Sequence, residues 1–488
     1  MSNKPYIAIL IIALMLLSAY PIYQLTDTNG FLFYRNAYDE STYLQYDFSR
    51  QAASLTRPGQ YLVSIAHWLG LSGGWANFLF DLVALILFLL LTRQIFKRLD
   101  FDETKANSLS FIMAFMPLFF GGLNPVINKA FNYNLESGLV YWVTMPEAAF
   151  LPIIRSPEPQ FSLILFLACL NLSLKWRSFI PAYLSLPFLY PFVALPISFV
   201  LITYHTYVRL PKLAKYSYLL PLASFLLVSL LLKAYFYTGN TDREILVSSF
   251  KPLLSITFLI AILIYLVARK SIPEKYRFFT LLVALSPLAA TNHQILTGLI
   301  TQPNNFEQYF GIYAIVLVVV MALHSKKIVF NKLLVALAMF LCIIFARNIF
   351  LDNYFSNKRI ELSGDLLNAL RTNASHVAIN DVRLASDLNL VFPRQSPTAL
   401  SYDQTFPLRA DKAFKEYLSA KKAILANEQA RSEFQDIIAA LDEAYKYENK
   451  DFILIHINRK KNFALEHDAT NIPADYEPSN LKIFTVKQ

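Results

Sequence analysis

Long apolar runs separated by short charged turns fill the first 350 residues of the chain. A bilayer core about 30 Å thick is crossed by roughly 20 apolar residues in helical form, so each run predicts a transmembrane span. The clear runs are Pro5–Leu25, Trp75–Ile95, Leu109–Leu123, Phe161–Leu174, Tyr216–Phe236, Leu253–Val267, Phe278–Ile300, Tyr309–Leu323 and Val329–Phe350. The pattern therefore predicts an α-helical polytopic membrane domain over residues 1–350.

The apolar run Ser178–Tyr207 is interrupted by prolines. An interior proline removes a backbone hydrogen bond and clashes with the preceding helical turn. We therefore expect two short helices that meet near Tyr190-Pro191. A broken helix at membrane depth needs protein or a water-filled cavity around its freed backbone groups.

The apolar segment Leu139–Ile154 is short and contains Pro146, Glu147 and Pro152. If this segment does not span, and the proline-rich run spans twice, most of the basic residues fall on one side of the membrane. That set is Lys4, Arg93, Lys97, Arg98, Lys105, Lys175, Arg177, Arg209, Lys212, Lys215, Arg269, Lys270, Lys275, Arg277, Lys326, Lys327 and Lys332. Basic loops remain cytoplasmic. We therefore predict eleven spans, a cytoplasmic N-terminus, an external C-terminus and a re-entrant or interfacial Leu139–Ile154.

The N-terminal apolar run and the loop after it predict a membrane anchor and an interfacial helix. Pro5–Leu25 has a long apolar stretch and a poor cleavage site, so we expect a retained signal anchor rather than a cleaved signal peptide. The first outer loop, 26–74, is long and partly apolar. Within it, Tyr61–Leu71 has apolar residues at helical spacing together with Trp68, which predicts a helix lying at the membrane interface.

The pattern changes at Leu351. Ser375–Asn380 and Asp451–Ile457 are short β-branched runs typical of strands, and Ala410–Tyr447 has a helical period. We expect residues 351–488 to form a small soluble α/β domain on the non-cytoplasmic side.

Composition supports a membrane protein and argues against nucleic-acid binding. Charged residues make up 16% of the chain, against about 25% in soluble domains. The net charge of +10 divides into +11 over the first 350 residues and −1 over the rest, so it follows the short loops. No basic stripe marks the C-terminal part, and we expect no nucleic-acid partner. Cys169 and Cys342 lie in apolar runs and are expected to be buried rather than paired in a disulfide.

Candidate chemistry begins with the adjacent acids Asp39 and Glu40, in the first outer loop. Two neighbouring carboxylates raise one another's proton affinity, so one of them could act as a general base. The alternative is that both acids only solvate the loop.

A second group consists of Glu147, Arg155, Glu158 and Gln160, on the same predicted outer face. Arg155 could hold a lipid phosphate through two parallel hydrogen bonds and stabilise it as a leaving group. It could equally anchor a helix end among lipid headgroups.

A third group is formed by His293, Gln294, Gln302 and Glu307 around the outer ends of two spans. Planar polar side chains beside aromatic residues suit sugar binding, although His293 could instead make an interhelical hydrogen bond. Arg347 could face the same phosphate or extend to the interface. Asp81 could hydrate the outer boundary or face a cavity.

Many spans, a long first outer loop with Asp39-Glu40, a broken helix pair and an outer C-terminal domain together resemble the GT-C superfamily of membrane glycosyltransferases. The resemblance implies an inverting transfer from a polyprenyl-phosphate-linked sugar to a hydroxyl of a glycan, lipid or protein in a bacterial inner membrane. In that family an acid of this loop is the base, a role that passes to Asp39 first and Glu40 second. The acid pair could hold a divalent cation, but its spacing does not require one.

Two other functions remain open from the sequence. O-antigen polymerases and ligases have a similar number of spans, although their large loop usually lies between late spans. A transporter or flippase would place charged residues at mid-membrane and often has two similar halves.

Overall fold

The computed structural model describes residues 59–71, 73–122, 141–143, 159–209, 219–237, 247–248, 252–300 and 303–324, helical positions between 333 and 344, and the strands 376–379, 398–401, 452–457 and 481–486. Two compact units result. The helical unit contains Asp81–Arg347, and the other contains Asn348–Gln488 together with Leu17–Ala53 and Gln60–Phe80.

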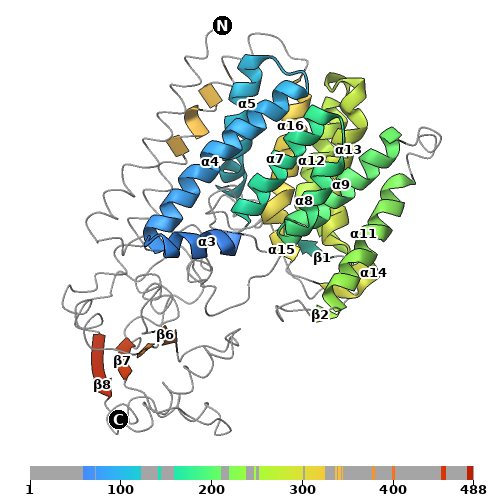
Figure 1. The fold of residues 1–488 in the computed structure, drawn as a ribbon. Coiled ribbons are helices and arrows are strands. Elements are labelled where there is room, and N and C mark those ends of the chain that lie inside the picture. The colour runs from blue at the N-terminus through green and yellow to red at the C-terminus, as the bar shows by residue number, and fades with distance from the viewer. Residues whose placement is uncertain are drawn as a thin grey trace. The chain divides into compact units, whose positions relative to one another are not determined.

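Apolar helices run alongside one another through the first unit (Figure 1). They include α4 (Gly73–Arg98), α5 (Glu103–Gly122), α7 (Gln160–Trp176), α9 (Pro191–Arg209), α11 (Leu220–Tyr237), α12 (Ile256–Ala268), α13 (Glu274–Thr291) and α16 (Ile312–Ala322). Within the described residues, Trp75–Arg98, Phe192–Arg209 and Glu274–Thr297 are long and apolar enough to cross a membrane. The chain is thus a helical membrane protein, while the count of eleven spans stays a prediction.

Exposed apolar side chains mark surfaces that suit lipid. Val83, Leu87 and Leu90 are exposed at helical spacing on α4, and Leu263 and Leu266 are exposed on α12. Such stripes would be unfavourable in water, but they are expected where a helix faces hydrocarbon chains. The opposite faces form the core, where α9, α12, α13 and α16 contribute the buried residues Val200, Ala261, Leu282, Ala284, Ala314 and Ile315.

The proline-rich run is broken where the sequence predicts. Helix α8 (Ile180–Ser185) passes into the 3-10 turn η2 (Leu186–Phe188), and α9 begins at Pro191. The Oγ of Ser173 accepts a hydrogen bond from the N–H of Ala182 at 3.0 Å, and the Oγ of Ser162 accepts one from the N–H of Tyr190 at 3.3 Å. The chain therefore returns along α7, from the end of that helix to its beginning.

The predicted span Leu253–Val267 is wrong at its first three residues. Leu253–Ser255 is strand β3, which pairs in parallel with β1 (Tyr141–Val143), and α12 begins only at Ile256. The Oγ of Ser255 caps α12 by accepting a hydrogen bond from the N–H of Phe258 at 3.0 Å. Of the segment Leu139–Ile154, the structure describes only the extended residues of β1.

The predicted span Phe278–Ile300 is also interrupted. Helix α13 ends at Thr291 because the side chain of Asn292 binds the backbone of Leu253, accepting from its N–H at 2.8 Å and donating to its carbonyl at 2.7 Å. The chain continues through the turn α14 (Gln294–Thr297) and through β4 (Leu299–Ile300), which pairs with β2 (Val247–Ser248). Gly298 ends α14 with φ of 73°, a conformation that glycine adopts without strain.

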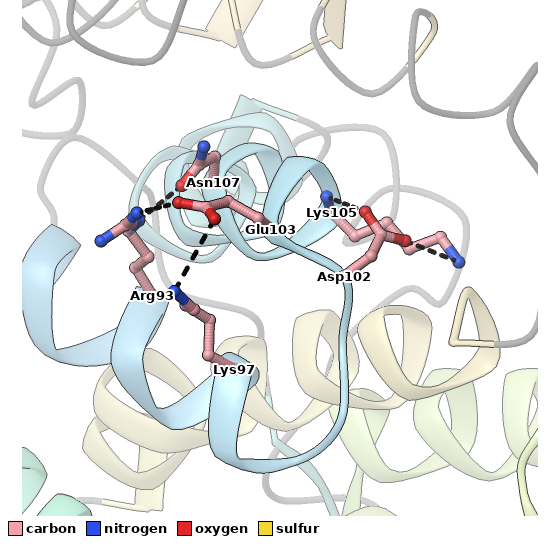
Figure 2. A network of polar contacts seen from close by, with 6 residues as sticks. All are labelled: Arg93, Lys97, Asp102, Glu103, Lys105 and Asn107. Atoms are coloured by element: carbon pink, nitrogen blue, oxygen red, sulfur yellow. Dashed lines mark hydrogen bonds and ion pairs between the residues drawn. The ribbon is translucent and has the colours of Figure 1, made fainter. Parts of the chain in front are cut away.

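Basic side chains gather where α4 ends and α5 begins. Figure 2 shows Arg93 between Glu103, at 2.6 Å, and Asn107, at 2.5 Å, with Lys97 3.8 Å from the same glutamate. Lys105 lies 3.4 Å from Asp102 on the other side of this turn.

Other basic residues join this end of the helical unit. Lys275 at the start of α13 pairs with Asp100 at 2.5 Å, Lys105 donates to the carbonyl of His324 after α16, and Arg209 at the end of α9 donates to the carbonyl of Arg177. We call this the basic end. Basic residues that the sequence assigns to one side of the membrane thus lie together, and the assignment of that side to the cytoplasm stays a prediction.

Helix and strand predictions outside the helical unit are confirmed where the structure describes them. Helix α3 (Gly59–Trp68) covers most of Tyr61–Leu71. Strands β5 (His376–Ile379) and β7 (Phe452–Ile457) correspond to the two predicted strands and pair in parallel. They form a sheet of order β6-β5-β7-β8 with β6 (Thr398–Ser401) and the antiparallel β8 (Leu481–Val486). The predicted helix Ala410–Tyr447 and the predicted anchor Pro5–Leu25 lie outside the described residues.

Candidate functional site

Buried polar side chains collect at the end of the helical unit opposite the basic end. Helices α7 and α9 start there, because their last residues are at the basic end. Helix α13 starts from Lys275 at the basic end, and α16 leads to His324 there, so the residues after α13 and before α16 lie at the opposite end. We call this the polar end and define it by Asp81, Gln160, Asn292, His293, Gln294 and Glu307, all buried.

Asp81 and Gln160 form a buried pair. Gln160 is the first residue of α7, and its Nε2 donates a hydrogen bond of 2.7 Å to Oδ1 of Asp81 on α4. The amide of Gln160 therefore orients the carboxyl group of Asp81. Buried ionisable groups in membrane helices are costly and tend to be functional. The pair joins Gln160, which the sequence predicts to bind substrate, to Asp81, for which the sequence leaves two roles open.

Glu307 opens the π-helical turn η4 (Glu307–Gly311) between α15 (Pro303–Phe306) and α16. Its side chain is 0% exposed. Oε2 accepts a hydrogen bond of 3.2 Å from the N–H of Thr257, in the first turn of α12, and no described residue makes a hydrogen bond to Oε1. Single π-helical turns occur often at functional sites.

Local sequence explains why Glu307 meets α12. Ser255 caps that helix, and its Oγ lies 3.2 Å from Oγ1 of Thr257, so the two hydroxyls stand beside the free N–H groups of the first turn. Gly311 allows the close approach of η4, because a Cβ at this position would collide with the side chain of Thr257. The carboxylate of Glu307 therefore also has a structural role, since an anion stabilises a helix N-terminus.

The side chains of the first two residues that follow α13, Asn292 and His293, contact backbone groups. The side chain of Asn292 binds both the N–H and the carbonyl group of Leu253. Nδ1 of His293 lies 2.8 Å from the carbonyl oxygen of Ala290 in the preceding turn, and Gln294 begins α14 fully buried. This contact of His293 lies within the preceding turn, so it is local and is not the interhelical hydrogen bond that the sequence leaves open.

Aromatic rings connect the start of α9 to the segment before α16. The ring centroids of Tyr190 and Tyr309 are 5.4 Å apart, and those of Phe192 and Phe306 are 5.1 Å apart. The ring of His293 lies against Phe306 at 5.4 Å. This aromatic cluster fixes His293 and the π-helical turn relative to α9.

The structure brings together four of the predicted site residues, namely Gln160, His293, Gln294 and Glu307, at the polar end. Asp39, Glu40, Glu147, Arg155, Glu158, Gln302 and Arg347 lie outside the described residues. The sequence prediction did not include Ser255 and Thr257. Their signal was a hydroxyl residue just before an apolar helical run, which is typical of a helix N-cap.

The described residues contain no group of three or more His, Cys, Asp or Glu side chains that could hold a metal ion. The described residues of the polar end offer carboxyl, amide and hydroxyl groups that can form hydrogen bonds beside aromatic rings. Comparison with known proteins finds no family model and no curated protein that matches this chain.

Proposed function

We propose that this chain is a membrane glycosyltransferase that moves a sugar from a polyprenyl-phosphate donor to an acceptor hydroxyl with inversion. The reaction takes place at the polar end, on the side of the membrane away from the basic end. The observation that carries the proposal is the buried pair of Asp81 and Gln160 at that end. Gln160 follows the predicted phosphate-binding residue Arg155 by only five positions.

In the proposed reaction, the acceptor oxygen forms a bond to the anomeric carbon as the bond from that carbon to the phosphate oxygen breaks. Asp39 or Glu40 takes the proton of the acceptor hydroxyl, and the polyprenyl phosphate leaves with the bonding electron pair. Arg155 stabilises the charge that develops on the phosphate. The base must come within about 3 Å of the hydroxyl, directly or through one water.

The proposal is tested with native membranes that contain the full chain and supply both lipid-linked donors and acceptors. We expect release of polyprenyl phosphate with the chain present, and loss of that release in Asp39→Asn. Asp100→Asn at the basic end is the matched control and should leave transfer unchanged. Full transfer in both Asp39→Asn and Glu40→Gln would exclude the first outer loop from the mechanism.

A transporter is the second candidate, and it is favoured by the buried acid Glu307 beside interrupted helices. Interrupted helices and buried acids line substrate and ion pathways in many transporters. Uptake or efflux of a solute by proteoliposomes, with no sugar transferred from any lipid-linked donor, would favour this function over the first.

A further inference from the structure

Glu307 is a buried acid whose charge is only partly compensated by the protein around it. No ion pair of the described residues includes Glu307, and its carboxyl group is fully buried. An ionised carboxylate away from water is strongly unfavourable unless a partner neutralises it. The N-terminus of α12 contributes only about half an elementary charge. Some positive charge is therefore still needed at this position.

Among the residues that the structure describes, the groups packed around η4 do not supply that charge. Helices α9, α12, α13, α15 and α16 contact this turn. The nearby titratable groups on or beside them that the structure describes are Tyr190, Tyr309, Tyr313 and His293, and Nδ1 of His293 lies against the carbonyl of Ala290. The charged residues of α9 and α13, namely Arg209, Glu274, Lys275 and Arg277, belong to the basic-end portions of these helices, and α12 contains no charged residue before Arg269, which follows its end.

Hydroxyl groups lie at the start of α12, where the carboxyl group is held. The hydroxyls of Ser255 and Thr257 are 3.2 Å from each other, and the N–H of Thr257 is 3.2 Å from Oε2 of Glu307. Oε2 is already held by the N–H of Thr257, while Oε1 has no hydrogen-bond partner in the described part of the chain. The position thus combines one negative charge, two hydroxyl oxygens and an unoccupied carboxylate oxygen.

We propose that Glu307, Ser255 and Thr257 form a binding site for a monovalent cation, Na⁺ or a proton, which bonds to Oε1 and neutralises the carboxylate inside the helical unit. A single charge is sufficient, because the site has one carboxylate. A divalent cation would normally require more carboxylate ligands than this position provides. Membrane proteins place Na⁺ and proton sites where helices are interrupted, as α12 and the π-helical turn are here. The proposal rests on the burial and the contacts of Glu307 and not on the proposed sugar transfer, although both place Glu307 at the polar end.

The first experiment measures thermal unfolding of the full purified chain in lipid nanodiscs while NaCl replaces choline chloride at constant ionic strength. If Na⁺ is the ligand, the unfolding temperature rises with Na⁺ in the wild type and does not respond in Glu307→Gln, because binding to the native state stabilises it. Glu274→Gln, which removes an exposed carboxylate, is the matched control and should respond like the wild type.

The second measurement distinguishes the proton. Infrared spectroscopy of the wild type should show the carbonyl band of a protonated, buried carboxyl group that is absent from Glu307→Gln and present in Glu274→Gln. An unfolding temperature that responds to Na⁺ equally in the wild type and Glu307→Gln, or not at all, together with no band that depends on Glu307, would overturn the proposal.

A milder substitution keeps the test decisive if Glu307→Gln fails to fold. Thr257→Val retains the N–H that holds Oε2 and the shape of the side chain, but it removes Oγ1. We expect the half-saturating Na⁺ concentration to rise about tenfold, or the pH midpoint of the carboxyl band to shift, since one polar contact is lost. Thr203→Val is the control, because the hydroxyl of Thr203 bonds only to the carbonyl of Phe199 in its own helix among the described contacts. Equal responses in the two variants would remove Thr257 from the site.

Discussion

Gln160 holds Asp81 through a hydrogen bond of 2.7 Å between two buried side chains that are 79 positions apart in the sequence. The bond fixes the start of α7 against α4. It also joins a residue that the sequence assigns to phosphate or sugar binding to an acid whose role the sequence leaves open. The pair therefore has a structural role that can be measured independently of any activity.

Replacing Gln160 by alanine should destabilise the protein by about 1–3 kcal/mol, because a buried carboxyl group loses a hydrogen-bond donor. Gln94→Ala provides the comparison, since Gln94 accepts a 2.6 Å bond from Asn171 but lies on an exposed surface. Denaturant unfolding in detergent measures both variants. Equal losses would show that burial of the Asp81 pair adds nothing to its contribution.

The two serines of α7 should hold the returning segment of the broken helix. Ser162→Ala and Ser173→Ala each leave a buried backbone N–H without its acceptor, which costs about 1–3 kcal/mol. Ser178→Ala should cost less, because its 3.4 Å contact with the N–H of Ile180 is exposed. Amide hydrogen exchange at Ala182 and Tyr190 checks the cause, and unchanged protection there would contradict it.

Gly311 should tolerate no side chain. In Gly311→Ala the new Cβ meets the side chain of Thr257, and we expect a loss of about 1–3 kcal/mol from overpacking. Adding Thr257→Ala should recover part of the loss, because the changes in unfolding free energy caused by substitutions at two residues in contact are not additive. Strict additivity of the two substitutions in unfolding experiments would mean that the close approach of η4 to α12 is absent.

The basic end should respond to acid through Asp100. The hydrogen bond from Lys275 holds the pKa of Asp100 below its ordinary value. The contribution of Asp100 to stability is therefore fully present above its unfolded pKa of about 4, and it disappears as pH falls through the lower pKa of the folded state. The effect should be small, because both side chains are exposed.

Asp100→Asn should remove this acid dependence while keeping the backbone, since asparagine tolerates the φ of 63° found at this position. Unfolding at pH values on both sides of the transition measures the effect. High salt should weaken it in the wild type by screening. If the stability of Asp100→Asn falls with pH as much as that of the wild type, the acid dependence comes from other groups and the prediction is wrong.

Sidedness can be measured by labelling cysteines in a chain from which Cys169 and Cys342 have been removed. With the basic end in the cytoplasm, the sequence assigns Asn240, between the predicted spans Tyr216–Phe236 and Leu253–Val267, to the outer side. An impermeant thiol reagent should then label Asn240→Cys in intact cells and reach Lys270→Cys only after the cells are opened. Labelling of Lys270→Cys in intact cells would place the polar end in the cytoplasm and contradict the proposed direction of sugar transfer.

Much of the helical architecture could be predicted from the sequence. The apolar runs that predicted α4, α5, α7 and α11 gave the correct helices, because long apolar runs have few other stable forms in a membrane. The break at Tyr190-Pro191 followed from proline chemistry in the same way. Those basic residues of the predicted set that the structure describes around the basic end lie together, because charges near helix ends follow the topology.

Hydropathy alone could not show where helices stop for tertiary reasons. Leu253–Ser255 and Leu299–Ile300 are as apolar as the helices beside them, yet they are strands because β1 and β2 pair with them. The site was only partly visible for the same reason. Glu307 and Gln160 stood out as polar residues at span ends, whereas Thr257 takes part through its backbone N–H, a group that every residue except proline carries.

The sequence by itself determined that the chain is a helical membrane protein, where most helices lie and which residues gather at the basic end, because apolar length and charge act locally. Only the tertiary structure decided that Asp81 meets Gln160 and that Glu307 meets the start of α12. Those contacts join residues 79 and 50 positions apart, and they depend on how the helices pack rather than on any local preference of the chain.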